Sequence, residues 1–101
     1  MPRPLTKLLV RPAAAADIEE AHRWYERQRV RLGEEFLTAV DATLQDLAAH
    51  PAAYAVIHRE TRRALLHRFP YAIFYRLYDE TVIVIACMHG RRDPKRWKGR
   101  A

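Results

Sequence analysis

The chain has 101 residues, of which 50% are apolar and 10% aromatic, and this composition predicts one folded domain over residues 1–101 rather than a disordered segment. No uncharged apolar run approaches the roughly 18 residues of a membrane-spanning helix, and the N-terminus, MPRPLTKLLVRP, has no signal-peptide core. The net charge is +6, and residues 51–101 carry eleven basic side chains against four acidic ones. The positive field of the second half favours an anionic partner, which the charge alone does not identify.

The first half of the sequence predicts a short strand and then two helices. Residues 5–10, LTKLLV, are the expected strand, which Arg11 and Pro12 end. A first helix is predicted over residues 13–32, because Ala14, Ile18, Ala21, Tyr25 and Leu32 recur at helical spacing on one side. Gly33 is expected to cap its C-terminus, and residues 34–49 form the second helix. The short break between the helices indicates a helical hairpin.

The last third of the sequence is rich in predicted strands. After a loop with a brief strand around residues 54–57, strands are expected over residues 63–69, 71–78 and 81–89. Alternation in the second of these predicts that Tyr71, Ile73, Tyr75 and Leu77 share one face and that Ala72, Phe74, Arg76 and Tyr78 share the other. Asp79 and Glu80 form the tight turn of an antiparallel hairpin. The last strand is apolar on both faces, as an interior strand is.

These elements predict an α+β fold with the order β-α-α-β-β-β. The sheet is expected to be mostly antiparallel, with the helical hairpin packed on one of its faces. The other face is expected to be at least partly open and to lie near the basic C-terminal segment.

That segment, MHGRRDPKRWKGR, follows the most apolar run of the chain and contains six Lys or Arg residues. His89 ends the last strand, where it could act as a general acid or base or simply cap the strand. Arginine forks suit phosphates and carboxylates alike. Trp97 is expected to pack on its own fold rather than on a nucleobase, and Asp93-Pro94 predicts the turn or short helix that brings it back.

Several kinds of site are excluded by what the sequence lacks. It contains no serine, and its three glycines exclude a glycine-rich phosphate cradle. The histidines show no metal-ligand spacing, so neither a metal nor another cofactor is expected. The lone cysteine, Cys87, cannot form an internal disulfide and is expected to pack as a small hydrophobe. This usage fits a reducing compartment, and we expect a cytoplasmic protein.

Four segments together resemble the RelE/ParE superfamily of type II toxin–antitoxin toxins, and most of all its ParE-like, plasmid-stabilisation branch. They are DIEEAHRWYERQRVRLGEEFL (17–37), HPAAY (50–54), RRALLHRFPYAIFYRL (62–77) and MHGRRDPKRW (88–97). The resemblance covers nearly the whole chain in the right order. It implies the same fold, and a small bacterial toxin that arrests growth and is neutralised by a co-expressed antitoxin.

The resemblance leaves two targets open. RelE-type members are ribosome-dependent endonucleases of messenger RNA, and typically carry an arginine after the tyrosine of the strand that here reads PYAIFY. This chain has Ala72 at that place, and a methyl group cannot stabilise the negative charge that develops at a cleaved phosphate. ParE-type members instead inhibit DNA gyrase, a type II topoisomerase, by binding it. We therefore expect a gyrase inhibitor that is not an enzyme, with an mRNA endoribonuclease as the alternative.

The resemblance and the charge pattern assign residues to three roles. The expected target-binding residues are Arg91, Arg92, Lys95, Arg96 and Trp97. For the nuclease alternative the expected catalytic residues are His89, Arg91 and Arg92. The antitoxin is expected to present an acidic, amphipathic C-terminal segment, to lie on the helical hairpin and to meet Trp24, Arg62, Arg63, Arg68 and Arg76. A third possibility is a degenerate toxin that serves only as a binding module.

Overall fold

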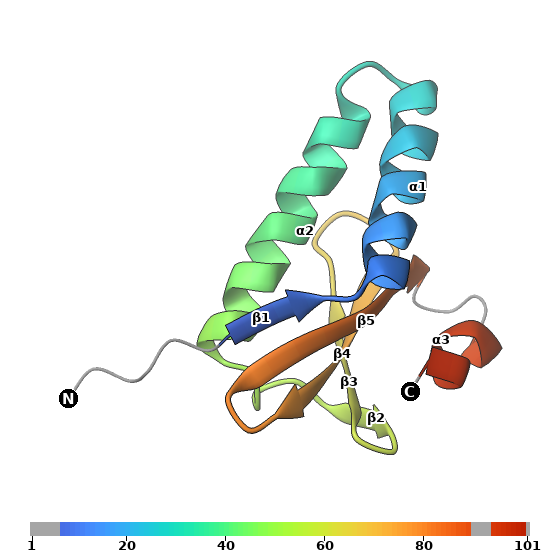
Figure 1. Ribbon diagram of the computed structural model, residues 1–101. Helices are drawn as coiled ribbons and strands as arrows, with labels where there is room; N and C mark the ends of the chain where they lie inside the picture. Colours follow the sequence, from blue (N-terminus) through green and yellow to red (C-terminus); the bar gives the residue numbers. More distant parts are fainter. Residues whose placement is uncertain (1–6, 90–93, 101) are drawn as a thin grey trace.

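The fold was analysed in a computed structural model that describes residues 7–89 and 94–100. Its elements in chain order are β1 (Lys7–Val10), α1 (Pro12–Gln28), α2 (Leu32–Ala49), β2 (Val56–His58), β3 (Thr61–Leu65), β4 (Tyr71–Tyr78), β5 (Thr81–His89) and α3 (Pro94–Arg100). The predicted α+β class and the order β-α-α-β-β-β are confirmed; the brief strand expected before the last three strands is β2, and the turn or short helix expected in the C-terminal segment is the helix α3 (Figure 1). Within these described ranges, no helix is long and apolar enough to cross a membrane.

The five strands form one sheet in the order β1-β5-β4-β3-β2. β1 runs parallel to β5, and the other neighbouring pairs are antiparallel. β4 and β5 have the predicted bounds and form the predicted hairpin, from Tyr78↔Thr81 at the turn to Tyr71↔His89 at the open end. The sheet therefore places Tyr71 and His89 side by side where β5 ends, and both residues line the groove described below.

An irregularity in β5 changes which of its residues share a face. Phe74 pairs with Ala86 and Tyr75 pairs with Val84, so Ile85 is an extra residue between these pairs. Such a bulge shifts the alternation of the strand. Ile85 and Ala86 consequently both join the cluster on one side of the sheet, whereas Val84 and Cys87 belong to the core on the other side.

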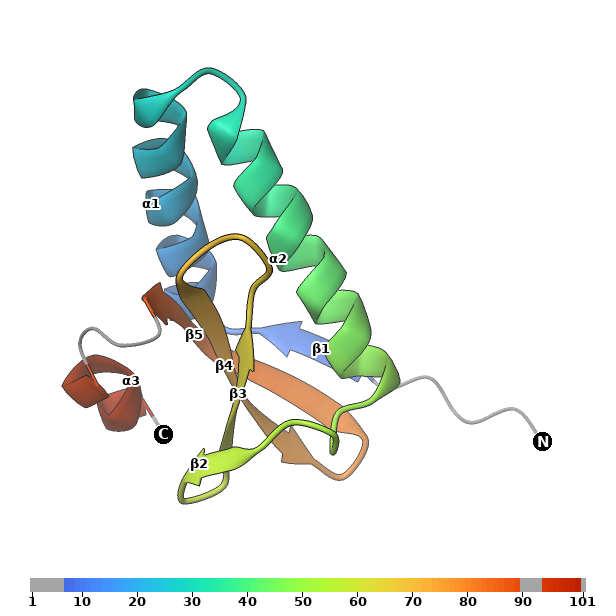
Figure 2. The same cartoon turned by 180° about the vertical axis from the view of Figure 1, so that it is seen from behind.

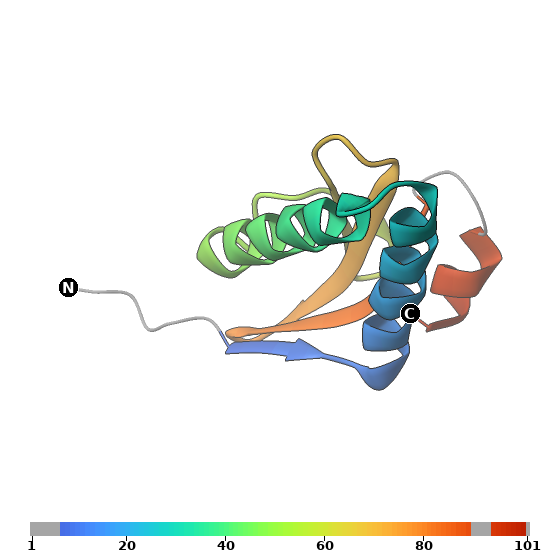
Figure 3. The same cartoon turned by 90° about the horizontal axis from the view of Figure 1, so that it is seen from above.

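The helical hairpin covers one face of the sheet, as predicted (Figure 3). Tyr25 of α1 and Phe36 of α2 stack with ring centroids 5.1 Å apart, and Phe69 meets both rings edge-on. The main core lies between these helices and the strands, with Leu47, Ile73, Tyr75, Val82 and Val84 fully or almost fully buried. The expectation that Ile73 and Tyr75 share one face and that Ala72 and Phe74 share the other is confirmed, and the first face is the one that meets the hairpin.

The opposite face is open only in part, because α3 packs on it. Trp97 of α3 lies against a second apolar cluster of β4 and β5 that contains Ala72, Phe74, Ile85, Ala86 and Met88. On β3 the same face remains uncovered, and Arg63 and Leu65 are exposed there. The predicted open face is thus limited to the side of the sheet away from α1.

The predicted end of the first helix was wrong. α1 ends at Gln28, and both Leu32 and Gly33 belong to the first turn of α2. The left-handed residue of the connection is Arg31, with φ of 72°, and not a glycine. Gly33 has a different purpose: a Cβ built on it would lie 2.7 Å from the His22 carbonyl oxygen, so the absent side chain lets the two helices approach.

The boundaries of two strands also differ from the prediction. β3 ends at Leu65 and not at residue 69, because residues 66–70 turn out of the sheet with Arg68 at φ of 70°. This loop reaches up to α2 (Figure 2), where Arg68 pairs with Glu35 and Phe69 enters the core. The brief strand expected at residues 54–57 is β2, shifted to Val56–His58. The expected start of the first strand, at residues 5 and 6, lies outside the described residues.

Candidate functional site

Helix α3 is held on the sheet by an aromatic stack. The Trp97 side chain is only 6% exposed, and its ring lies over Phe74 with centroids 4.6 Å apart and planes 14° from parallel. The His58 ring of β2 meets the indole edge-on at 5.8 Å. Trp97 therefore packs on its own fold, as expected, and any contribution to target binding comes through the placement of its neighbours.

A carboxylate of α1 holds the other end of α3. Asp17 accepts two hydrogen bonds from the Arg100 guanidinium, at 2.5 Å from Nη1 and 3.2 Å from Nη2. It also accepts the Cys87 backbone N–H at 3.0 Å, and Arg100 Nη1 donates to the Ile85 carbonyl at 3.2 Å. The Asp17 side chain is 8% exposed. A partly buried, bidentate pair of this kind is geometrically specific, so it fixes how α3 sits against α1 and β5.

A groove of about 460 Å³ runs between α1, the open end of the β4–β5 hairpin and α3. Its α1 wall consists of side chains at helical spacing, and its floor comes from the strand ends; the lining residues are Asp17, Glu20, Ala21, Trp24, Tyr25, Arg27, Pro70, Tyr71, Cys87, Met88, His89 and Arg96. The volume lies within the range of ligand sites in proteins. The groove combines apolar and aromatic surface with carboxylates near one end of α1 and an arginine near the other.

His89 lines this groove beside Tyr71, with ring centroids 6.1 Å apart. It is half-buried at the end of an interior strand, which fixes its position more firmly than a loop would. Arg96 of α3 lines the same groove. The structure thus brings a histidine, a tyrosine and an arginine to one surface, although these belong to three different elements.

Cys87 also borders the groove but is chemically shielded. Cys87 is only 1% exposed. Burial raises the pKa of its thiol to about 12, and the Asp17 charge adds a smaller effect in the same direction. The thiol therefore stays protonated at neutral pH and cannot act as a nucleophile in the folded chain. The expectation that Cys87 packs as a small hydrophobe is confirmed.

The structure describes three of the five expected target-binding residues, all on α3. Lys95 and Arg96 are exposed on α3, whereas Trp97 is buried beneath them. Arg91 and Arg92, expected both for target binding and for catalysis in the nuclease alternative, lie outside the described residues. Arg100, another cation of the same segment, pairs with Asp17 and is not a solvated charge.

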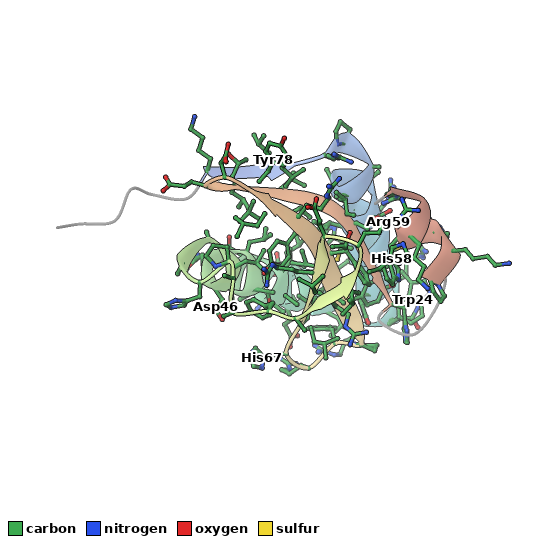
Figure 4. The ribbon with its side chains drawn as sticks, turned by 90° about the horizontal axis from the view of Figure 1, so that it is seen from below. Trp24, Asp46, His58, Arg59, His67 and Tyr78 are labelled. Atoms are coloured by element: carbon green, nitrogen blue, oxygen red, sulfur yellow. The ribbon has the colours of Figure 1, made fainter. Side chains whose placement is uncertain are left out.

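The expected antitoxin-binding residues are divided between the two faces of the sheet. Trp24 is 48% exposed on α1 (Figure 4), and Arg68 is exposed beside α2. Arg62 points to the hairpin side, where it donates to the carbonyls of Ala52 at 3.2 Å and Tyr54 at 2.6 Å. Arg63 and Arg76 belong to the opposite face, because their cross-strand partners are Phe74 and Thr61. A single antitoxin segment on the helical hairpin would therefore lie on the same side of the sheet as Trp24, Arg62 and Arg68, but not as Arg63 and Arg76.

The Arg68 guanidinium reaches a carboxylate that a second arginine also binds. Glu35 accepts a hydrogen bond at 2.8 Å from Arg68 and another at 2.8 Å from Arg29. These hydrogen bonds, first that of Arg68, lower the pKa of Glu35 below its usual value. The hairpin connection and the β3–β4 loop are thereby tied to the same side chain.

Two residues of the site have no signal in the sequence that could have identified them. Asp17 lies early in a helix, where the helix dipole favours an acid, but its pairing with a residue 83 positions later has no local signal. Glu20 lies in the same part of α1 and lines the groove. The predicted helical stripe places Ala21 and Tyr25 on one side of the helix, but the spacing does not indicate the strand ends that face them.

Three comparisons place this geometry among known proteins. The family model described as the ParE toxin of the type II toxin–antitoxin system parDE matches residues 8–94. The protein named Toxin ParE2 from Mycobacterium tuberculosis is 27% identical over 89 residues, which are 87% of this chain and 85% of that protein. Similar solved structures come from a chromosomal ParDE system of P. aeruginosa, with a TM-score of 0.64 at 19% identity over 84% of this chain and 96% of the other. The toxin–antitoxin complex RelBE2 of Mycobacterium tuberculosis gives a TM-score of 0.63 at 22% identity, over 85% of this chain and 99% of the other.

Proposed function

Because the chain belongs to the ParE toxin family of type II toxin–antitoxin systems, we propose that it arrests bacterial growth by binding DNA gyrase, and that it performs no chemistry of its own. Gyrase inhibition is the activity that the resemblance of the sequence implies for the ParE-like branch. The matched residues cover both helices of the hairpin and all of the sheet except the first residue of β1, so the proposal concerns the whole fold and not one motif.

The observation that carries the proposal is the environment of Ala72. This residue occupies the place where the resemblance expects an arginine in the nucleases, and it is 0% exposed beneath the cluster that Trp97 covers. An arginine there would have to displace that cluster, and the methyl group present cannot hold a developing negative charge. A binding role needs no such charge, so the buried alanine favours it.

For binding we propose the surface formed by the groove and by the adjoining cations of α3, Lys95 and Arg96, together with Arg91 and Arg92. The groove offers apolar area beside Trp24 and Tyr71, and the Arg96 cation of α3 lines it. Interfaces gain most of their affinity from such partly enclosed aromatic surface, and flanking charges increase the rate of association.

A gyrase supercoiling assay tests this surface. We expect the purified chain to block supercoiling, and the pair Lys95→Glu with Arg96→Glu to raise the concentration needed at least tenfold. The matched control is Lys7→Glu with Arg23→Glu, which makes the same change of charge at exposed residues of β1 and α1. An unmodified chain that leaves supercoiling unaffected at high excess would overturn the proposal.

The ribosome-dependent endonuclease remains the second candidate, because His89 is half-buried in the same groove as Tyr71 and Arg96. In that case His89 would transfer the proton, and Arg91 or Arg92 would stabilise the phosphate charge. His89→Ala separates the two candidates: it should abolish toxicity in a nuclease, whereas a gyrase inhibitor would lose one of several side chains of the groove and should keep most of its toxicity.

We further propose that a cognate antitoxin covers the helical hairpin with an acidic, amphipathic C-terminal segment. Trp24, Val30 and Leu37 are exposed apolar residues of the hairpin and its connection, and Arg68 adds a cation beside α2. The similar solved structures come from toxin–antitoxin systems, which supports a partner of this kind. Purification of the chain from its native operon should yield a second, acidic chain; recovery of the toxin alone would contradict this part of the proposal.

A further inference from the structure

Helix α3 presents different side chains to its two flanks. Successive residues of a helix are about 100° apart, so with Trp97 directed at the sheet, Arg96 and Arg100 fall on one flank and Lys98 on the other. The pairing of Arg100 with Asp17 and the position of Arg96 in the groove identify the first flank as the one towards α1. Lys98 consequently lies on the flank towards β2 and β3, and Lys95 points away from the sheet.

Cations of β3 and of the β2–β3 turn approach that second flank. His58 meets the Trp97 ring at 5.8 Å, so β2 lies beside α3, and Figure 4 shows His58 and Arg59 at that end of the molecule. Arg63 pairs with Phe74 across β3 and β4, which places its side chain on the face where Trp97 stacks on Phe74. We call the exposed cations Arg59, Arg63, Lys95 and Lys98 the α3 face.

The positive charge of the α3 face is not offset by the acid that lies closest to it in sequence. Glu60 follows Arg59, but its carboxylate accepts a hydrogen bond at 2.6 Å from Arg76, a fifth cation on the same side of the sheet. None of the four cations of the α3 face takes part in an ion pair recorded among residues 7–89 and 94–100. The α3 face therefore carries about four positive charges on a rigid support of strand and anchored helix.

The composition of this face favours phosphates over a protein partner. Protein interfaces need an apolar centre, but the aromatic residues here, Phe74 and Trp97, are buried, and Leu65 alone is an exposed large apolar residue on this side of β3. Binding of phosphates draws on counterion release and needs only well-placed cations. The α3 face also lies across the sheet from the helical hairpin, so a segment on the hairpin leaves it accessible.

We propose that the α3 face binds the phosphate backbone of duplex DNA. The phosphate chemistry follows from the four cations alone, whereas the choice of duplex DNA over RNA rests on the proposed function, because a toxin bound to gyrase lies beside the DNA that gyrase handles. The contact is expected to be independent of sequence, because contacts with phosphates position a protein on the duplex but carry no direct sequence information.

The test measures DNA binding by the purified full chain without gyrase. The fluorescence anisotropy of a labelled 24-base-pair duplex is followed from 50 to 200 mM KCl. Four neutralised phosphates predict a slope of log K against log [KCl] of about −3.6, at about 0.9 per phosphate. Arg63→Gln with Lys98→Gln should reduce that slope to about −1.8, and Lys7→Gln with Arg23→Gln, which removes the same charge elsewhere, should leave it unchanged.

Three outcomes would overturn the proposal. Equal slopes for the two double variants would mean that the α3 face is not the site. Binding of an RNA duplex of the same length at least tenfold tighter than DNA would point to RNA and away from gyrase. Binding of poly-glutamate with no binding of either nucleic acid would identify the face as a protein-docking surface. Gyrase inhibition is measured separately by supercoiling, so the failure of this proposal and the failure of the proposed function are distinguishable.

Discussion

The Tyr75 hydroxyl shows how a single buried polar group ties the sheet to the end of α2. It donates a hydrogen bond to the Pro51 carbonyl at 2.6 Å, and its residue is fully buried. Burial raises the pKa of Tyr75 to about 12, from an ordinary value near 10. A phenol with a higher pKa in the folded state than in the unfolded chain stabilises the fold fully below pH 10, and this stabilisation is lost as the pH rises towards 12.

We therefore expect the free energy of unfolding to fall steeply between about pH 10 and pH 12. Tyr75→Phe should lower it by about 1 kcal/mol at neutral pH, because the hydrogen bond to Pro51 is lost, and should also make the alkaline decrease shallower. Urea unfolding at pH 7 to 11 measures both effects. Tyr25, Tyr54 and Cys87 keep part of the decrease in the variant, because their pKa values are raised as well. An unchanged alkaline profile would show that Tyr75 does not carry the effect.

The buried thiol of Cys87 makes a second prediction at this scale. With the pKa raised to about 12, little thiolate exists at pH 8, so a disulfide reagent such as Ellman's reagent should leave the native chain unmodified. The rate should rise with urea in step with unfolding. Reaction of the native chain at the rate of a free thiol would mean that the groove opens far enough to expose β5.

At the scale of elements, a close approach of α1 and α2 depends on one glycine. Gly33→Ala would place a Cβ 2.6 Å from His22 Cδ2 and 2.7 Å from the His22 carbonyl oxygen. The ring atom can move, but the carbonyl belongs to α1. We expect a loss of about 1–2 kcal/mol, because the overpacking cost exceeds the roughly 1 kcal/mol that alanine gains over glycine within a helix.

Gly99 of α3 is the matched control, because a Cβ there would meet nothing within 4 Å. Gly99→Ala should raise the free energy of unfolding by about 0.5–1 kcal/mol. Thermal or urea unfolding of the two variants compares them directly. Equal effects of the same sign would show that the approach of α1 and α2 is looser than the structure indicates.

The docking of α3 makes the second prediction at this scale. Asp17→Asn removes the charge that holds Arg100, and we expect a loss of about 2 kcal/mol, less than for a fully buried pair because Arg100 is partly exposed. The chain contains two tryptophans, so a Trp24→Phe background leaves Trp97 as the only one. The fluorescence emission of Trp97 should shift to the red if α3 moves away from the sheet. Arg100→Gln should give a similar result, and the double variant should lose less than the sum. Additive losses would show that the two residues act independently.

The accuracy of the sequence-based prediction varied between elements for identifiable reasons. β4 and β5 were predicted with the correct bounds, because an alternating strand, a tight turn and an apolar strand in succession indicate an antiparallel hairpin. The end of α1 was misplaced because a glycine between two helical patterns normally indicates a C-cap, whereas Gly33 serves the contact with His22. That contact depends on tertiary packing, which local spacing does not encode.

The site was harder to predict than the fold. Trp97 was correctly expected to pack inward, since an indole within a basic run needs apolar cover. The groove depends on α1, two strand ends and α3 coming together, and on a pair formed by Asp17 and Arg100. The sequence identified some of the participants, such as Trp24, His89 and Arg96, but not which of them share a surface.

At the scale of the whole molecule, the sheet separates two surfaces of different character. The hairpin side carries exposed apolar residues and the Glu35 ion pairs, and the α3 side carries cations around a buried aromatic stack. The excess positive charge of the second half of the sequence is therefore not spread evenly over the molecule. A partner on the hairpin and an anionic partner on the α3 face can be accommodated together, which agrees with the proposals of an antitoxin on the hairpin and of DNA on the α3 face.

The most direct measurement of the central claim is induction of this chain alone in a bacterial host that carries a DNA-damage reporter, beside the His89→Ala variant. A gyrase inhibitor that performs no chemistry predicts growth arrest with the reporter switched on, for both the unmodified chain and the variant. Growth arrest with a silent reporter, lost in His89→Ala, would contradict the account and identify the groove as the active site of a ribosome-dependent endonuclease.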